Sequence, residues 1–112
     1  MEKLTWIELL FKRGHGLDAF RDRFLLDCHR QRVEEDMEQE GGRREELRRA
    51  ALTAIESDDP ATIVQGLSFL LVAGSESDTS VVEPLTRSTN EAIQKAAKTC
   101  LFELSSNRRL TR

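Results

Sequence analysis

Two stretches of the chain, residues 51–74 and 81–104, follow the same apolar pattern thirty positions apart. Each has a short apolar segment, a cluster of helix-breaking residues and a longer amphipathic segment. Repetition with this period is typical of stacked helical hairpins, because one hairpin cannot bury its apolar face without a neighbour. The sequence therefore predicts two packed hairpins. Apolar or small residues occupy the aligned positions, as in the pairs Ile63 and Ile93, Leu67 and Ala97, and Leu70 and Cys100.

Helical spacing of apolar residues recurs along the whole chain, whereas the alternation of a half-buried strand does not. We therefore predict an all-α fold in a single domain spanning 1–112. Pro60 and Gly74 mark the expected start and end of one helix, and Gly41-Gly42 is expected to end another. The expected helices are 4–12, 17–40, 43–56, 60–73, a short one around 81–85, and 90–104, followed by a frayed tail at 106–112.

The repeated half of the chain resembles the HEAT repeat family in its short bacterial form of about 30 residues. The resemblance covers Leu47 to Leu104 and depends on the apolar pairs and on the two breaker clusters. It also depends on second helices that begin Pro60-Ala61-Thr62-Ile63 and Asn90-Glu91-Ala92-Ile93. It implies a short right-handed α-solenoid of two hairpins within 43–105. Residues 1–42 contain no third copy, so they form either an N-terminal helical cap on the first repeat or the functional part.

Composition excludes several classes of protein. Charged residues make up 33% of the 112 residues, but the net charge is only -3. This balance disfavours a general nucleic-acid binder, for which an excess of basic residues is expected. No segment reaches the roughly 18 continuous apolar residues of a membrane helix, and no signal-peptide core follows Met1. We expect a cytoplasmic protein without a membrane partner. Cys28 and Cys100 are expected to be reduced core residues.

Few residues are suited to catalysis. His15 lies between two glycines, and His29 is expected on the surface or in a groove. Asp27, Cys28 and His29 are neighbours on one helix and point in different directions, so they cannot close on one metal ion. The sequence predicts no catalytic residues, no metal site and no cofactor, and thus a protein that is not an enzyme.

Charges are unusually placed around Gly41-Gly42. Carboxylates crowd the C-terminal end of the long helix and arginines crowd the start of the next, where the helix dipole disfavours each of them. Either the two groups pair across the turn, or the acids form a surface for a basic partner. The acids are Glu34, Glu35, Asp36, Glu38 and Glu40, and the arginines are Arg43, Arg44, Arg48 and Arg49. The binding hypothesis names Glu34, Glu35 and Glu38.

Apolar residues also lie outside the expected core stripes. The long helix has two apolar stripes, one with Leu17, Phe20, Phe24 and Cys28 and the other with Leu26, Val33 and Met37, so it needs two packing surfaces or a kink. The HEAT resemblance implies that the second helices line a concave face. A groove there would include Phe69, Val72, Lys95, Lys98 and Phe102, unless these residues pack against neighbouring helices.

These observations predict a non-enzymatic protein-binding module whose partner is another protein with a basic surface. Because some bacterial immunity proteins and antitoxins resemble HEAT folds, the most specific form of this hypothesis is a protein that neutralises its target by steric occlusion. The alternative is a nucleic-acid-binding module, although nucleic acid is the less expected partner. Its phosphate contacts would be Arg43, Arg44, Arg48, Arg49, Arg108, Arg109 and Arg112.

Overall fold

The computed structural model describes residues 5–110, with side chains up to residue 105, and confirms an all-helical chain over that range. The helices are α1 (Trp6–Lys12), α2 (Arg23–Gln39), α3 (Arg44–Ala54), α4 (Pro60–Ala73), α5 (Thr79–Val82) and α6 (Glu91–Leu110). Two 3₁₀ helices, η1 (Glu76–Asp78) and η2 (Glu83–Arg87), flank α5. The described residues contain no strand.

Local chemistry sets the helix starts. Thr5 and Glu8 form a reciprocal capping box at α1, and the Asp59 carboxylate accepts a hydrogen bond from the Thr62 N–H (3.1 Å) at the start of α4. Pro60 follows Asp59 at the first helical position, and Gly74 ends the helix, both as predicted. Asn90 caps α6, where its Oδ1 accepts the N–H groups of Ala92 and Ile93.

Two predicted boundaries are wrong. The long helix begins at Arg23 rather than at residue 17, because Asp22 caps it by accepting the Leu25 N–H (2.9 Å). The residues before it form a series of turns, in which Gly14 has a φ of 76° and Gly16 a φ of 91°. Glycine adopts such positive φ values without steric cost. The last helix, expected to end at residue 104, continues to Leu110.

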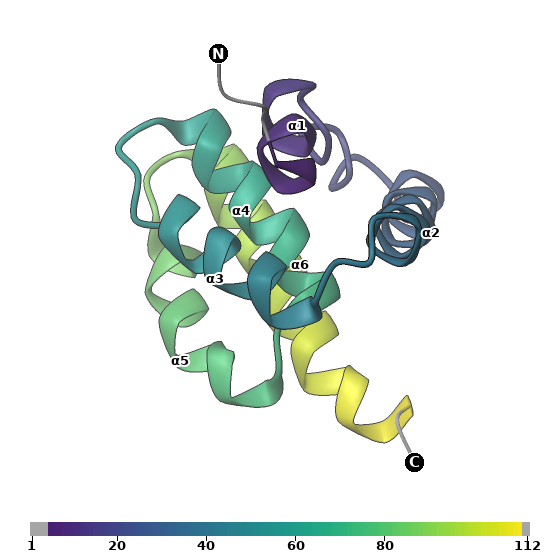
Figure 1. The fold of residues 1–112 in the computed structure, drawn as a ribbon. Coiled ribbons are helices and arrows are strands. Elements are labelled where there is room, and N and C mark those ends of the chain that lie inside the picture. Colours follow the sequence, from purple (N-terminus) through teal and green to yellow (C-terminus); the bar gives the residue numbers. More distant parts are fainter. Residues whose placement is uncertain (1–4, 111–112) are drawn as a thin grey trace.

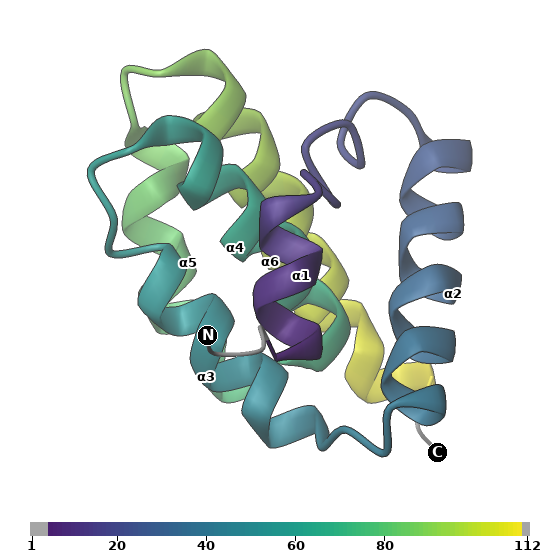
Figure 2. The same ribbon diagram turned by 45° about the horizontal axis from the view of Figure 1, so that its top comes forward.

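The helices form three layers (Figures 1 and 2). The helices α4 and α6 occupy the middle, α3 and the segment from α5 to η2 cover one side, and α1 and α2 lie on the other. A Cβ at Gly66 would lie 2.8 Å from the Cβ of Ala54. Glycine at this position therefore permits the close approach of α3 and α4. Every residue from 63 to 73 is buried, so α4 has neighbours on all sides.

The N-terminal segment is joined to α4 by both ring packing and hydrogen bonds. The Phe11 ring packs on Phe69 with centroids 4.9 Å apart, which is within the usual range for aromatic pairs. The Gln65 side chain donates to the carbonyl oxygens of Phe11 and His15, both at 3.0 Å. These contacts hold the end of α1 and the following turn against α4, and α2 lies at the outer edge of the molecule (Figure 2).

The repeated apolar positions lie in one core. The aligned residues Ile63 and Ile93, Leu67 and Ala97, and Leu70 and Cys100 are all buried in the same cluster. Within the described part of the chain, no helix combines the length and the apolar character needed to cross a bilayer.

Candidate partner-binding surface

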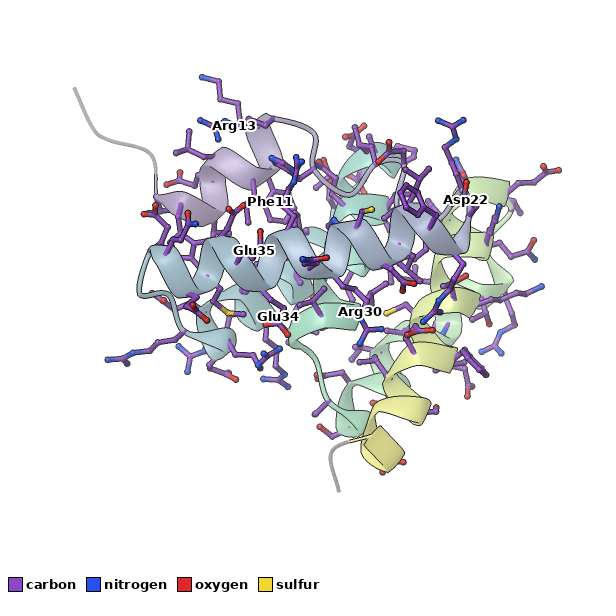
Figure 3. The ribbon with its side chains drawn as sticks, turned by 90° about the vertical axis from the view of Figure 1, so that its right-hand side faces the viewer. Phe11, Arg13, Asp22, Arg30, Glu34 and Glu35 are labelled. Carbon is purple, nitrogen blue, oxygen red and sulfur yellow. The ribbon has the colours of Figure 1, made fainter. Side chains whose placement is uncertain are left out.

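Helix α2 buries one face and exposes the other. Leu26, Val33 and Met37 face the core. His29, expected on the surface or in a groove, is buried and lines a hollow. In the stripe with Leu17, Phe20, Phe24 and Cys28, only Phe20 is buried, and it lies in the turns before α2. Phe24 is 74% exposed and Cys28 is also exposed, so α2 has no second packing surface, and the expected core position of Cys28 was wrong. Figure 3 looks onto the outer face of α2, with α1 above it and the end of α6 below.

The C-terminal end of α2 remains acidic in the fold. The last turn contains no basic residue that would offset the helix dipole. Of the five carboxylates between residues 34 and 40, only Glu34 forms an ion pair with a described residue, at 2.8 Å from Arg44. Glu35 accepts a hydrogen bond from Gln31 (3.3 Å), and both Glu35 and Glu38 are exposed. The acids therefore form a largely unneutralised surface.

The arginines after Gly41-Gly42 pair mostly within the repeats. Arg48 donates to both carboxylate oxygens of Asp78, at 2.8 Å and 2.7 Å, in the two-pronged geometry typical of strong guanidinium pairs. Arg48 also contacts Glu45 (3.0 Å), as does Arg49 (3.3 Å). Pairing across the turn is thus limited to Arg44 with Glu34. Three of the arginines named for phosphate contacts are already paired, and the side chains of Arg108, Arg109 and Arg112 lie outside the described residues.

Only part of the groove predicted on the second helices is exposed. Phe69 is 0% exposed and contacts the rings of Phe11 and His29, and Val72 is also buried, so neither can contact a partner. Both residues pack against neighbouring helices, which was the alternative to contact with a partner. Lys95, Lys98 and Phe102 are exposed on α6, with Phe102 at 66%. Their spacing of three and four residues places them on one face of that helix.

A buried carboxylate connects α2 to α6. The Glu103 side chain is 6% exposed and accepts hydrogen bonds from Arg23 (2.7 Å) and from Arg30. Phe24 follows Arg23 in α2, and Phe102 precedes Glu103 in α6, so this cluster fixes the two helices that carry the exposed phenylalanines. Figure 3 shows Arg30 on the edge of α2 that faces α6.

Beside α2, the turns before it enclose a polar hollow of about 300 Å³. Two imidazoles, a thiol and two guanidinium-bearing residues come together there, although no sequence pattern connects them. The paired glycines around His15 are the signal that could have indicated a special turn. The residues that line the hollow are Arg13, Gly14, His15, Gly16, Asp18, Leu25, Cys28, His29 and Arg32.

The two histidines of the hollow are neutral near pH 7. Burial is the main cause that lowers the pKa of His29. Its Nε2 lies 3.1 Å from the Ser68 carbonyl oxygen. Since a carbonyl only accepts, Nε2 carries the proton. Burial, and then the positive charge of Arg32, lower the pKa of His15.

No three His, Cys, Asp or Glu side chains of the described chain are grouped closely enough to bind a metal ion.

Comparison with protein-family models, with curated proteins and with solved structures found no match to this chain.

Proposed function

We propose that this protein is a non-enzymatic protein-binding module that receives a basic partner on the outer face of α2. The observation that carries this proposal is the acidic end of α2, where Glu35 and Glu38 are exposed and have no cationic partner among the described residues. A partner with a basic surface would supply the charges that the fold does not. Steric occlusion of that partner, as by an immunity protein or antitoxin, is the most specific form of the proposal.

Exposed aromatic rings would complement this charge. Phe24 is exposed on α2 about three turns before Glu35, and therefore on the same face of that helix, and Phe102 is exposed on α6. Large aromatic side chains contribute much of the affinity in protein interfaces, whereas acidic residues mainly set the association rate and the choice of partner. Lys95 and Lys98 would then border the interface rather than form its centre.

We also propose that the repeated half is a short right-handed solenoid of two HEAT-like hairpins, α3 with α4 and the α5–η2 segment with α6. The shared burial of the aligned residues supports this arrangement. In such a solenoid α4 and α6 would line the concave face, and α1 and α2 would cover part of it. The partner would accordingly meet α2 and the exposed face of α6 rather than a bare concave groove.

Matched charge reversals test the proposal. Immobilised wild-type protein, E35K/E38K and the control E56K/D58K are compared for capture of proteins from an extract of the source cells, and the partner recovered by the wild type is purified. Glu56 and Asp58 belong to the loop between α3 and α4, away from α2. We expect E35K/E38K to slow association with the purified partner and to reduce its salt dependence, while the control binds like the wild type.

F24A and F102A should speed dissociation without changing the association rate much. Failure of the wild type to bind any protein, or equal binding by E35K/E38K and E56K/D58K, would overturn the assignment of the acidic surface. Loss of affinity in the control alone would place the interface on the repeats.

A further inference from the structure

We propose that the polar hollow between α2 and the turns at 13–18 binds the oxyanion group of a small molecule, with Arg32 and the backbone N–H of Gly16 as its main donors. The residues that line this hollow do not include Glu35, Glu38, Phe24 or Phe102, so either proposal can fail without the other.

Donors without acceptors are the first observation. The side chains of Arg32 and Arg13 line the hollow from exposed positions, and neither guanidinium forms an ion pair or hydrogen bond with a described residue. In the same part of the chain, Arg23, Arg30 and Arg44 all pair with carboxylates. A guanidinium presents a planar fork of donors that matches carboxylate and phosphate oxygens. An oxyanion in the hollow would provide the acceptor that the fold leaves out.

The backbone of the turn supplies the second observation. Gly16 is buried, has a φ of 91° and lines the hollow, yet its N–H donates to no acceptor among the described residues. Buried N–H groups are almost always paired, and turns with this handedness commonly present them to anions. A side chain is excluded here, since a Cβ at Gly16 would lie 2.0 Å from the Ser68 Oγ.

Charges around the hollow permit a single anionic group. Arg13 and Arg32 contribute two positive charges and Asp18 one negative charge, while Asp36 on α2 faces His15 from outside the lining. The imidazoles of His15 and His29 are neutral and add polar surface rather than charge. An ionised carboxylate only accepts hydrogen bonds, so Asp18 suits a ligand that also carries a hydroxyl group as a donor.

Volume limits the ligand to a small molecule. The hollow measures about 300 Å³, which is at the lower end of the range for small-molecule sites. It can accommodate a phosphate or carboxylate group with a short organic substituent. An extended acidic peptide would need a longer groove than these turns form.

Inorganic phosphate and acetate are the probes, each titrated at constant ionic strength against chloride. The imidazole resonances of His15 and His29 and the amide resonance of Gly16 are followed by NMR. We expect saturable shifts with phosphate, with acetate or with both, and none with chloride. Bound anion should also raise the pKa of His15, because it opposes the effect of Arg32.

Arg32→Gln should weaken binding about tenfold or more, since a charge-assisted hydrogen bond is lost. Arg21→Gln is the matched control, because Arg21 is an exposed arginine of the same turns that does not line the hollow. Amide spectra of both variants verify the fold. Alkylation of Cys28 by iodoacetamide provides a second readout, and saturating phosphate should slow it in the wild type but not in Arg32→Gln.

Shifts that follow ionic strength alone, or that persist in Arg32→Gln, would overturn the site. Binding of an acidic peptide in the absence of any phosphate or acetate binding would also overturn it.

Discussion

Glu103 should contribute more to stability than the exposed charged residues of α6. Its buried carboxylate accepts hydrogen bonds from two arginines of α2. The substitution Glu103→Gln keeps the size of the side chain but removes its charge and places an amide N–H₂ against one guanidinium. Hydrogen bonds to charged groups contribute about 1.5–3 kcal/mol each, and breaking a fully buried pair costs about 3–5 kcal/mol.

The two arginines are not equally buried, and this difference fixes the expected cost. Arg23 is 63% exposed and regains water when its partner is removed. Its contribution is therefore below about 1 kcal/mol. Arg30 is 27% exposed and regains much less. We expect Glu103→Gln to lower the free energy of unfolding by about 2–3 kcal/mol, and Arg23→Gln to lower it by less than about 1 kcal/mol.

Urea denaturation followed by circular dichroism measures both changes. A loss of about 2–3 kcal/mol corresponds to a fall in the midpoint of about 1–2 M for a domain of this size. Hydrogen exchange should locate the effect, with faster exchange in α2 than in α3 or α4. A cost below about 0.5 kcal/mol for Glu103→Gln, or equal costs for the two variants, would refute the reasoning that this carboxylate fixes α2 to α6.

Three further predictions concern the core, an ion pair and the thiols. Leu70 is fully buried in the shared core. Leu70→Ala should therefore cost about 2–5 kcal/mol in urea melts, and a loss below about 1 kcal/mol would place it at the periphery. Asp78→Asn should destabilise the fold at pH 7 and flatten its acid sensitivity. The hydrogen bonds from Arg48 lower the pKa of Asp78 from its ordinary value of 3.8. The stabilisation is thus present above that value and is lost as pH falls below it, and an unchanged acid profile would contradict this. A neutral thiol reagent should modify Cys28 in the native protein and Cys100 only on unfolding, because burial raises the pKa of the Cys100 thiol and excludes the reagent; equal rates would contradict the burial.

Helices with local start and stop signals could be predicted from the sequence. Asp59, Pro60 and Gly74 determine the start and end of α4, and Asn90 determines the start of α6. The thirty-residue repeat correctly placed the aligned apolar residues in one core, because residues at equivalent positions of the two repeats face the same interior.

The start of α2 could not be predicted from periodicity alone. Leu17 and Phe20 continue the helical spacing backwards from Phe24, although they lie in turns. The helix starts after Asp22, which caps it. Asp22 is recognised as a cap only by the hydrogen bond that it accepts from the Leu25 N–H, because in the sequence it resembles any exposed acidic residue. The sequence therefore shows an apparent second apolar stripe, in which Phe24 is grouped with Leu17 and Phe20 although these two residues lie outside its helix.

The candidate site depended on contacts between residues far apart in the chain. The charge pattern around Gly41-Gly42 indicated both acids and bases, but not that Arg48 would turn to Asp78, thirty residues away. Likewise, His29 is buried because the Ser68 carbonyl accepts its Nε2–H, a contact between α2 and α4 that no local pattern contains. Sequence periodicity reports which side of a helix is apolar, but not which segment covers it.

The polar residues of α4 explain why the N-terminal segment lies where it does. On an exposed concave face, Gln65 would bond to water. Here it donates to the carbonyl oxygens of Phe11 and His15, which precede α2, so the side chain is paired with the N-terminal segment instead. The Phe69 ring packs against the rings of Phe11 and His29, so α1 and α2 both contact this part of α4. The surface open to a partner on this side of the molecule is therefore the outer face of α2, which is also where the unneutralised carboxylates lie.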